Sequence, residues 1–138
     1  MKVQSESEMI KVAAKLGNVI LNEVTKNYVI YLEGDLGAGK TTFVKGFMRG
    51  MSFDEVVNSP TFSLIERIEL LKHYVFHVDL YRINNQAELF ELDLHEEPYL
   101  DKPAIHLIEW PQKGEDIILS PDLKITFRTL EDPNQREI

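Results

Sequence analysis

The sequence contains no cysteine, one tryptophan and fewer basic than acidic residues. Without cysteine there is no disulfide, no thiolate metal site and no cysteine nucleophile. Lysine and arginine number 15 against 23 aspartates and glutamates, so the net charge is −8. Such a surface as a whole should repel nucleic acid. A role on RNA would therefore need a local basic patch or a partner that supplies one.

Long apolar runs are missing as well. No stretch approaches the ~20 residues of a membrane span. Residues 1–20 are charged and amphipathic and lack the apolar core of a signal peptide. We therefore expect a cytoplasmic protein with no membrane contact. The length of 138 residues, the apolar fraction of 43% and the lack of repeats or linkers predict a single domain, residues 1–138.

The most informative stretch is residues 28–42, which read YVIYLEGDLGAGKTT. Apolar residues at 29–32 predict a buried parallel strand, and apolar residues at helical spacing in 43–48 predict a helix. Between them lies a full match to the G-x-x-x-x-G-K-[ST] pattern. The matching residues are Gly34, Asp35, Leu36, Gly37, Ala38, Gly39, Lys40 and Thr41. Strand, glycine loop and helix occur in the order that a phosphate-binding loop requires.

The chemistry of this loop explains its spacing. Glycines let several backbone N–H groups turn toward one anion, and the following helix adds its positive N-terminal end. Lys40 can reach the β- and γ-phosphates, and the Thr41 hydroxyl can ligate Mg²⁺. A glycine-rich turn without a ligand is the plain alternative, but the complete motif in its proper context favours nucleotide binding. We predict that the loop, together with Thr42, binds ATP or ADP.

Two further segments end an apolar strand on an acid. Residues 74–78 lead into Asp79, and residues 104–108 lead into Glu109. This is typical of the Walker B arrangement, in which a carboxylate meets Mg²⁺ directly or through water. Each acid alone could be a surface residue, and which of them touches the metal stays open. Thr61 alone reads as a turn hydroxyl, but phosphate-loop proteins also use a switch threonine to contact Mg²⁺ or the γ-phosphate.

The remaining patterns complete an α/β fold. Ser5 and Glu8 form a possible capping box before an amphipathic helix that extends to residue 20. Residues 62–68 suit a strand, residues 86–94 a short helix, and residues 117–127 a final strand or hairpin. We predict a three-layer fold with a mixed, mostly parallel central sheet and antiparallel strands toward the C-terminus.

Four other residues are predicted mainly to pack. The histidines show no metal-site spacing, so His73, His77 and His106 are interpreted as ordinary packed or edge residues. Trp110 is a packing residue by default, although it directly follows Glu109 and should lie near the site. The acidic residues in 88–97 are either a solvated face or a docking surface for a basic partner.

With these residues in place, the chain resembles the TsaE family, also called YjeE. The resemblance covers the whole chain and lies in four segments, which together are highly specific. They are GDLGAGKTT at 34–42, SPTF at 59–62, HVDLYR at 77–82 and LIEWPQ at 107–112.

The resemblance implies an ATPase that works with TsaD and TsaB in making threonylcarbamoyladenosine in tRNAs that read codons beginning with A. Its ATP turnover would support repeated cycles of the TsaD–TsaB complex, and tRNA would be met only through that complex. Carried over by position, the resemblance implies that Lys40 and the glycines hold phosphates and that Thr41 and Glu109 are the metal candidates. It also implies that Asp79 is needed for turnover and that Thr61 lies in the switch-like segment.

Two positions near the chain ends bear on contacts with the parts of the nucleotide outside the triphosphate. The resemblance implies a polar contact from Arg136. Met9 stands where many members carry a threonine near the base, so the base contact of this region stays open, while the triphosphate site is unaffected.

Two other function classes compete with this interpretation. A small metabolite or nucleotide kinase could use the same loop, but it needs a lid with several arginines, and the arginines here are scattered. A GTP switch would carry an N-K-x-D guanine-reading motif, and the sequence has none.

Overall fold

The structure is a computed structural model that describes residues 1–57, 64–114 and 116–138. The chain forms two compact units. The first contains Met1–Val24, Glu33–Asn58 and Ile125–Ile138, and the second contains Thr25–Leu32 and Ser59–Lys124. The predicted switch residue Thr61 and its segment 59–62 lie outside the described residues.

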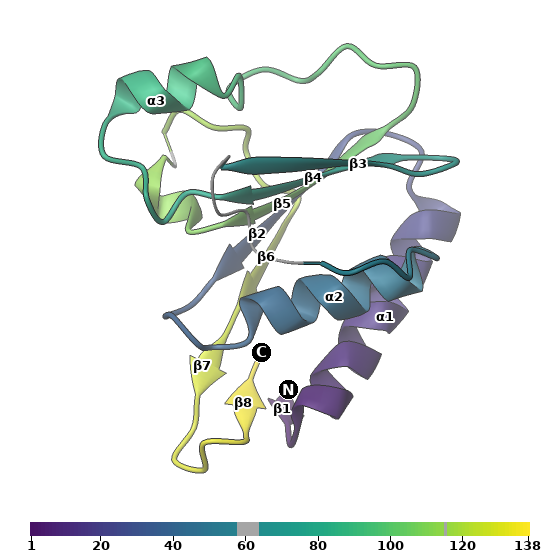
Figure 1. The fold of residues 1–138 in the computed structure, drawn as a ribbon, viewed down its shortest axis with the longest axis vertical. Coiled ribbons are helices and arrows are strands. Elements are labelled where there is room, and N and C mark those ends of the chain that lie inside the picture. The colour runs from purple at the N-terminus through teal and green to yellow at the C-terminus, as the bar shows by residue number, and fades with distance from the viewer. Residues whose placement is uncertain (58–63, 115) are drawn as a thin grey trace. The chain divides into compact units, whose positions relative to one another are not determined.

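Two long helices dominate the first unit. Helix α1 spans Glu6–Glu23 and helix α2 spans Lys40–Gly50, and they lie side by side (Figure 1). Ser5 caps α1 as predicted, because its Oγ accepts a hydrogen bond from the Glu8 amide at 3.2 Å. The reciprocal half of the capping box is displaced by one residue, since the Glu8 carboxylate accepts from the Gln4 amide at 2.7 Å.

Small residues let α1 and α2 approach each other closely. A Cβ at Gly17 of α1 would come within 2.1 Å of the Phe47 carbonyl oxygen, and one at Gly50 of α2 within 2.0 Å of the Ala14 carbonyl oxygen. No side chain fits at these two positions without moving a helix. The glycines therefore determine how deeply α2, which begins directly after the phosphate loop, packs on α1.

The first unit also contains a small sheet, in which antiparallel strands toward the C-terminus occur as predicted, although the segments that form them were not predicted. Strands β1 (Lys2–Val3), β8 (Arg136–Glu137) and β7 (Arg128–Thr129) lie in the order β1-β8-β7, with antiparallel pairing throughout. Strands of two residues have no periodicity to detect, and the tail reads only as polar. The pairing places Arg136 opposite Val3, near the start of α1.

The second unit is built on a five-stranded sheet in the order β3-β4-β5-β2-β6. The strands are β2 (Tyr28–Glu33), β3 (Ile65–Glu69), β4 (Tyr74–Asp79), β5 (Ala104–Glu109) and β6 (Leu123–Thr126). β5 pairs parallel with β2 and with β4, while β3 pairs antiparallel with β4. All six residues of β5 are buried, as expected for a central parallel strand. The mixed, mostly parallel sheet is confirmed.

Two predicted boundaries are wrong. Helix α3 spans only Gln86–Glu91, because the chain turns at Leu92 and Asp93 adopts a φ of 53°. Residues 117–119 form no strand, since the amides of Ile117 and Ile118 both donate to the Gly114 carbonyl in a turn. Ile118 is apolar because it packs into the core with Leu89 of α3. Within the predicted segment 117–127, the strand is therefore β6 (Leu123–Thr126), without the hairpin. In the described residues, no helix has the length and apolar character to cross a membrane.

Candidate nucleotide site

The phosphate loop of the first unit has the backbone that its glycines permit. Gly37 has a φ of 77° and Gly39 a φ of 105°, which side chains with a Cβ rarely adopt. The Ala38 amide donates to the Asp35 carbonyl at 3.1 Å and closes the turn at the tip of the loop. Gly39 is the N-cap of α2, so the loop runs directly into the first turn of that helix.

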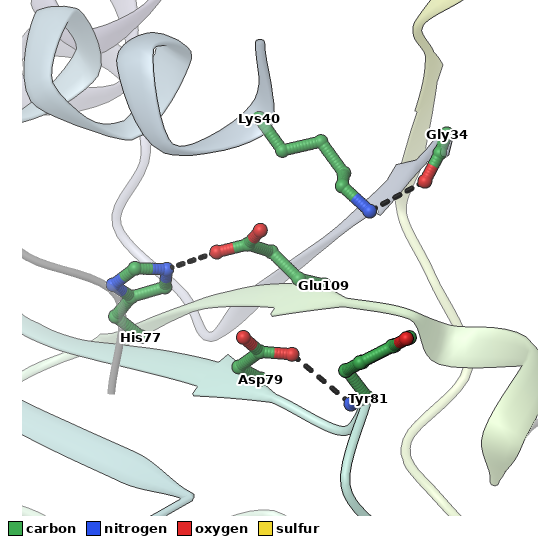
Figure 2. Close-up of polar contacts among 6 residues, drawn as sticks. All are labelled: Gly34, Lys40, His77, Asp79, Tyr81 and Glu109. Carbon is green, nitrogen blue, oxygen red and sulfur yellow. Dashed lines mark hydrogen bonds and ion pairs between the residues drawn. The ribbon is translucent and has the colours of Figure 1, made fainter. Parts of the chain in front are cut away.

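Lys40 is the first residue of α2 and turns its side chain back into the loop. Its Nζ donates to the Gly34 carbonyl at 2.5 Å, and the residue is only 5% exposed (Figure 2). The amides of a first helical turn have no partner within the helix and attract anions. A buried ammonium beside such a helix start is the donor set that phosphate groups need.

A pocket of about 180 Å³ adjoins this loop within the first unit. It lies between the start of α1, the loop and the C-terminal segment. The lining residues are Ser5, Glu6, Met9, Gly37, Gly39, Thr42, Pro133, Asn134 and Arg136. The pocket brings the two ends of the sequence to the phosphate loop.

Met9 and Arg136, which the sequence singled out, both line this pocket. Met9 packs against the loop, with its Cε 3.2 Å from where a Cβ of Gly39 would lie. Arg136 donates to the Gly37 carbonyl at 3.2 Å and to the Pro133 carbonyl at 2.7 Å. The guanidinium therefore ties the C-terminal segment to the loop. A contact of Arg136 with nucleotide stays a prediction.

The second unit brings together the two acids that the sequence placed on separate strands. Asp79 ends β4 and Glu109 ends β5, and the two residues are direct partners in the parallel register. Glu109 is also the register partner of Leu32 on β2, two residues before the phosphate loop begins in the sequence. The carboxyl ends of parallel strands are where α/β folds place their ligand sites.

Each acid is held by a hydrogen bond. Asp79 Oδ1 accepts from the Tyr81 amide at 3.0 Å, which turns the chain at the end of β4 (Figure 2). Glu109 is 3% exposed, and its Oε2 lies 2.6 Å from Nε2 of His77. The Glu109 carbonyl accepts from the Leu80 amide at 3.1 Å.

His77 is the residue that sequence reasoning missed. It had been interpreted as a packing histidine, yet it makes the shortest described side-chain contact to Glu109. The alternation of β4 puts His77 and Asp79 on one face. Only the register of β5 shows that Glu109 shares this face. The sequence pattern could therefore place His77 beside Asp79 but not beside Glu109.

The other central histidine fits the packing interpretation. His106 lies on β5, on the opposite face from Glu109, and its ring stacks on Phe76 at 5.1 Å between centroids. Burial lowers the pKa of His106 from 6.5 to about 4. His106 is therefore neutral at pH 7.

Trp110 follows Glu109 with a left-handed backbone, φ 58°, and its ring packs 4.9 Å from that of Tyr81. The predicted packing role of Trp110 is therefore observed. Within the described residues, no cluster of three or more potential metal-ligating side chains occurs. In phosphate-loop proteins generally, Mg²⁺ takes most of its ligands from water and phosphate oxygens.

The sheet order and the glycine loop define an α/β protein with the phosphate-loop NTPase fold. A crystal structure of YdiB from Bacillus subtilis matches with a TM-score of 0.70 and 29% identity, over 99% of this chain and 79% of that one. The family model described as "Threonylcarbamoyl adenosine biosynthesis protein TsaE" matches residues 3–138. The chain therefore belongs to the TsaE family, and the resemblance seen in the four motifs is confirmed.

Curated relatives carry the same name. The protein named "tRNA threonylcarbamoyladenosine biosynthesis protein TsaE" from Haemophilus influenzae is 32% identical over 137 residues, 99% of this chain and 85% of the relative. The protein of that name from Bacillus subtilis is 38% identical over 110 residues, 80% of this chain and 66% of the relative. A third, from Nostoc, is 41% identical over 99 residues, 71% of this chain and 61% of the relative.

Proposed function

We propose that the protein is a single-domain, Mg²⁺-dependent ATPase of the cytoplasm that supports tRNA threonylcarbamoyladenosine formation together with TsaD and TsaB. In this proposal tRNA is reached only through the TsaD–TsaB complex. The observation that carries the ATPase part is the buried ammonium of Lys40, the first residue of α2, which donates to the loop carbonyl of Gly34. The pathway rests on the names of the relatives.

The loop residues have distinct roles in this proposal. Backbone N–H groups from Gly34 to Thr42 and the start of α2 hold the phosphates, and Lys40 neutralises charge on the β- and γ-phosphates. Trp110 and Arg136 contribute to the nucleotide contacts outside the phosphates. For Arg136 the support is that it lines the pocket beside the loop, and for Trp110 that it directly follows Glu109.

The acids divide the metal and water chemistry. We assign Glu109 as the direct carboxylate ligand of Mg²⁺ with the Thr41 hydroxyl, and Asp79 as the group that orients water or a metal-bound water. Thr61 acts as the switch residue for the metal or the γ-phosphate. Bound Mg²⁺ would neutralise charge that develops on the β- and γ-phosphate oxygens. The adjacent register of Asp79 and Glu109 supports this assignment, because both carboxylates leave the sheet at the same edge.

The proposal also includes a partner protein that completes the ATP site. An arginine supplied by a partner can accelerate phosphoryl transfer by roughly 10³ to 10⁵. The arginines of this chain are scattered, and Arg82, three residues after Asp79, is assigned to brace that turn. The acidic residues of 88–97 offer a surface that attracts a basic patch over a long range. We therefore expect slow hydrolysis by the isolated protein.

The test is steady-state phosphate release by the protein alone and with the purified TsaD–TsaB complex, at low and moderate salt. We expect stimulation by the complex that weakens as salt rises. Equal rates in both conditions would remove the partner requirement but leave the ATP site standing. Transfer of the γ-phosphate to an added metabolite or nucleotide would instead support the kinase alternative.

A further inference from the structure

We infer that His77 is a positioning residue for Glu109, and that its imidazole sets the direction in which the Glu109 carboxylate faces the metal. This inference rests on the proposed ATPase function. The observation behind it is the 2.6 Å contact between His77 Nε2 and Glu109 Oε2, which joins the central strands β4 and β5 (Figure 2).

The contact is isolated from solvent. The His77 side chain is fully buried and that of Glu109 is 4% exposed. A carboxylate that binds a metal accepts hydrogen bonds and does not donate them, so in this proposal Nε2 of His77 is the donor. A charge-assisted hydrogen bond of this length in a buried place is strong and restricts the rotamers of both side chains.

Strand β4 and Leu80, the residue that follows it, hold Glu109 at two points. The Leu80 amide donates to the Glu109 carbonyl at 3.1 Å and fixes its backbone, while His77 fixes its side chain. With Oε2 engaged by the imidazole, Oε1 is the atom left to meet a metal, in the part of the chain that the structure describes. A flexible glutamate would lose rotamer entropy at each binding event, and a held one does not.

This arrangement matches a general feature of metal sites. Residues that hydrogen-bond a metal ligand orient it, and their loss typically lowers metal affinity or activity by about 10- to 100-fold. The plain alternative is that the pair only stabilises the sheet. The alternatives differ in what a variant changes: positioning affects the response to Mg²⁺, whereas a structural pair affects unfolding alone.

The variants separate these two roles. His77→Leu keeps much of the side-chain bulk but removes the donor. His77→Asn is polar, yet its amide ends near the position of Nδ1 and falls short of Glu109. His77→Gln carries an amide N–H close to the position of Nε2 and should restore part of the contact. His106→Leu is the matched control, because it replaces a buried histidine on the opposite face of the same sheet.

The measurement is the dissociation constant of ADP with and without Mg²⁺, by calorimetry on the full chain, with thermal unfolding of every variant. We expect equal Mg²⁺-free affinity throughout. The gain in affinity on adding Mg²⁺ should fall by about 10-fold or more in His77→Leu and His77→Asn, with partial recovery in His77→Gln. The His106→Leu control should match the parent protein.

Three results would count against the inference. If folded His77→Leu or His77→Asn keeps the full Mg²⁺ response, His77 has no positioning role. The same holds if His77→Gln falls as far as these variants, or if the parent protein binds ADP without any response to Mg²⁺. A parent protein that binds neither ADP nor ATP overturns the proposed function itself, which is a different failure. Should His77→Leu not fold, His77→Asn decides.

Discussion

The phosphate loop and the acid pair are built in opposite ways. The loop is contiguous: Gly34 to Thr41 follow one another, and each residue obtains its geometry from its neighbours in the sequence. The acid pair joins Asp79 and Glu109, which lie 30 residues apart and meet only because β4 and β5 pair in one register. One belongs to the first unit and the other to the second.

The difference explains what each region tolerates. The loop depends on backbone conformations, so glycines and a buried lysine are its essential parts. The acid pair depends on register, and a slip of one residue would turn its carboxylates to the other face of the sheet. It therefore needs additional hydrogen bonds, which His77, Leu80 and Tyr81 provide. Variants in the two regions should separate binding from hydrolysis.

The largest expected effect is on hydrolysis. Glu109→Ala and Asp79→Ala should each lower the rate of ATP hydrolysis by about 10² or more, since positioned acid–base and metal-orienting groups contribute 10²–10⁴. ATP affinity measured without Mg²⁺ should remain within a few-fold, because the phosphate loop is untouched. Single-turnover phosphate release and calorimetry on the same preparations test this. Hydrolysis at the parent rate by either variant would refute the role assigned to that acid.

Lys40→Ala should produce the opposite pattern, a loss of binding. The ammonium is a buried cation at the loop, and removing several charge-assisted hydrogen bonds should weaken ATP affinity by about a hundredfold. Arg49→Ala removes a cation from the exposed end of the same helix and serves as the control. Calorimetric titration gives both affinities. Unchanged affinity in Lys40→Ala would contradict the assigned phosphate site.

The third prediction concerns stability rather than ligand. Burial lowers the pKa of His106 from 6.5 to about 4, so its protonation favours the unfolded chain. The associated stability is complete above pH 6.5 and lost as the pH falls toward 4. Its full size is about 3 kcal/mol in the free energy of unfolding for a lowering from 6.5 to about 4.

Urea unfolding of the parent and His106→Leu at several pH values between 7 and 4 isolates the contribution of His106 to the free energy of unfolding. The carboxylates are common to both proteins, but the variant lacks the His106 imidazole. Its free energy of unfolding should therefore fall less than that of the parent as the pH is lowered. Parallel curves would mean that His106 does not carry the effect.

The smallest expected effect is spectroscopic. Trp110 directly follows Glu109 and is the only tryptophan, so its emission should change when ATP or ADP binds. A fluorescence titration measures this, and Lys40→Ala at the same nucleotide concentrations is the control, since it should give no change. An emission spectrum that stays constant at saturation would place Trp110 away from the nucleotide.

The residue pattern within short segments of the sequence was enough to predict several parts of this protein. The strand, glycine loop and helix of residues 28–50, the Ser5 cap and the acids that end β4 and β5 were all predicted correctly. Each of these features depends on neighbouring residues: an apolar run, a hydroxyl before a helix, or glycines where φ is positive. The assignments of function to Lys40, Thr41, Thr61, Asp79 and Glu109 stay predictions.

Tertiary structure alone decided the rest. The partnership of His77 with Glu109 needs the register of two strands, and the pairing of Val3 with Arg136 joins residues more than 130 positions apart. Ile118 lies in the same buried cluster as Leu89, so an apolar residue of a turn was interpreted as part of a strand. A contact between distant segments is selected by the packing of the whole core, and no short pattern records it.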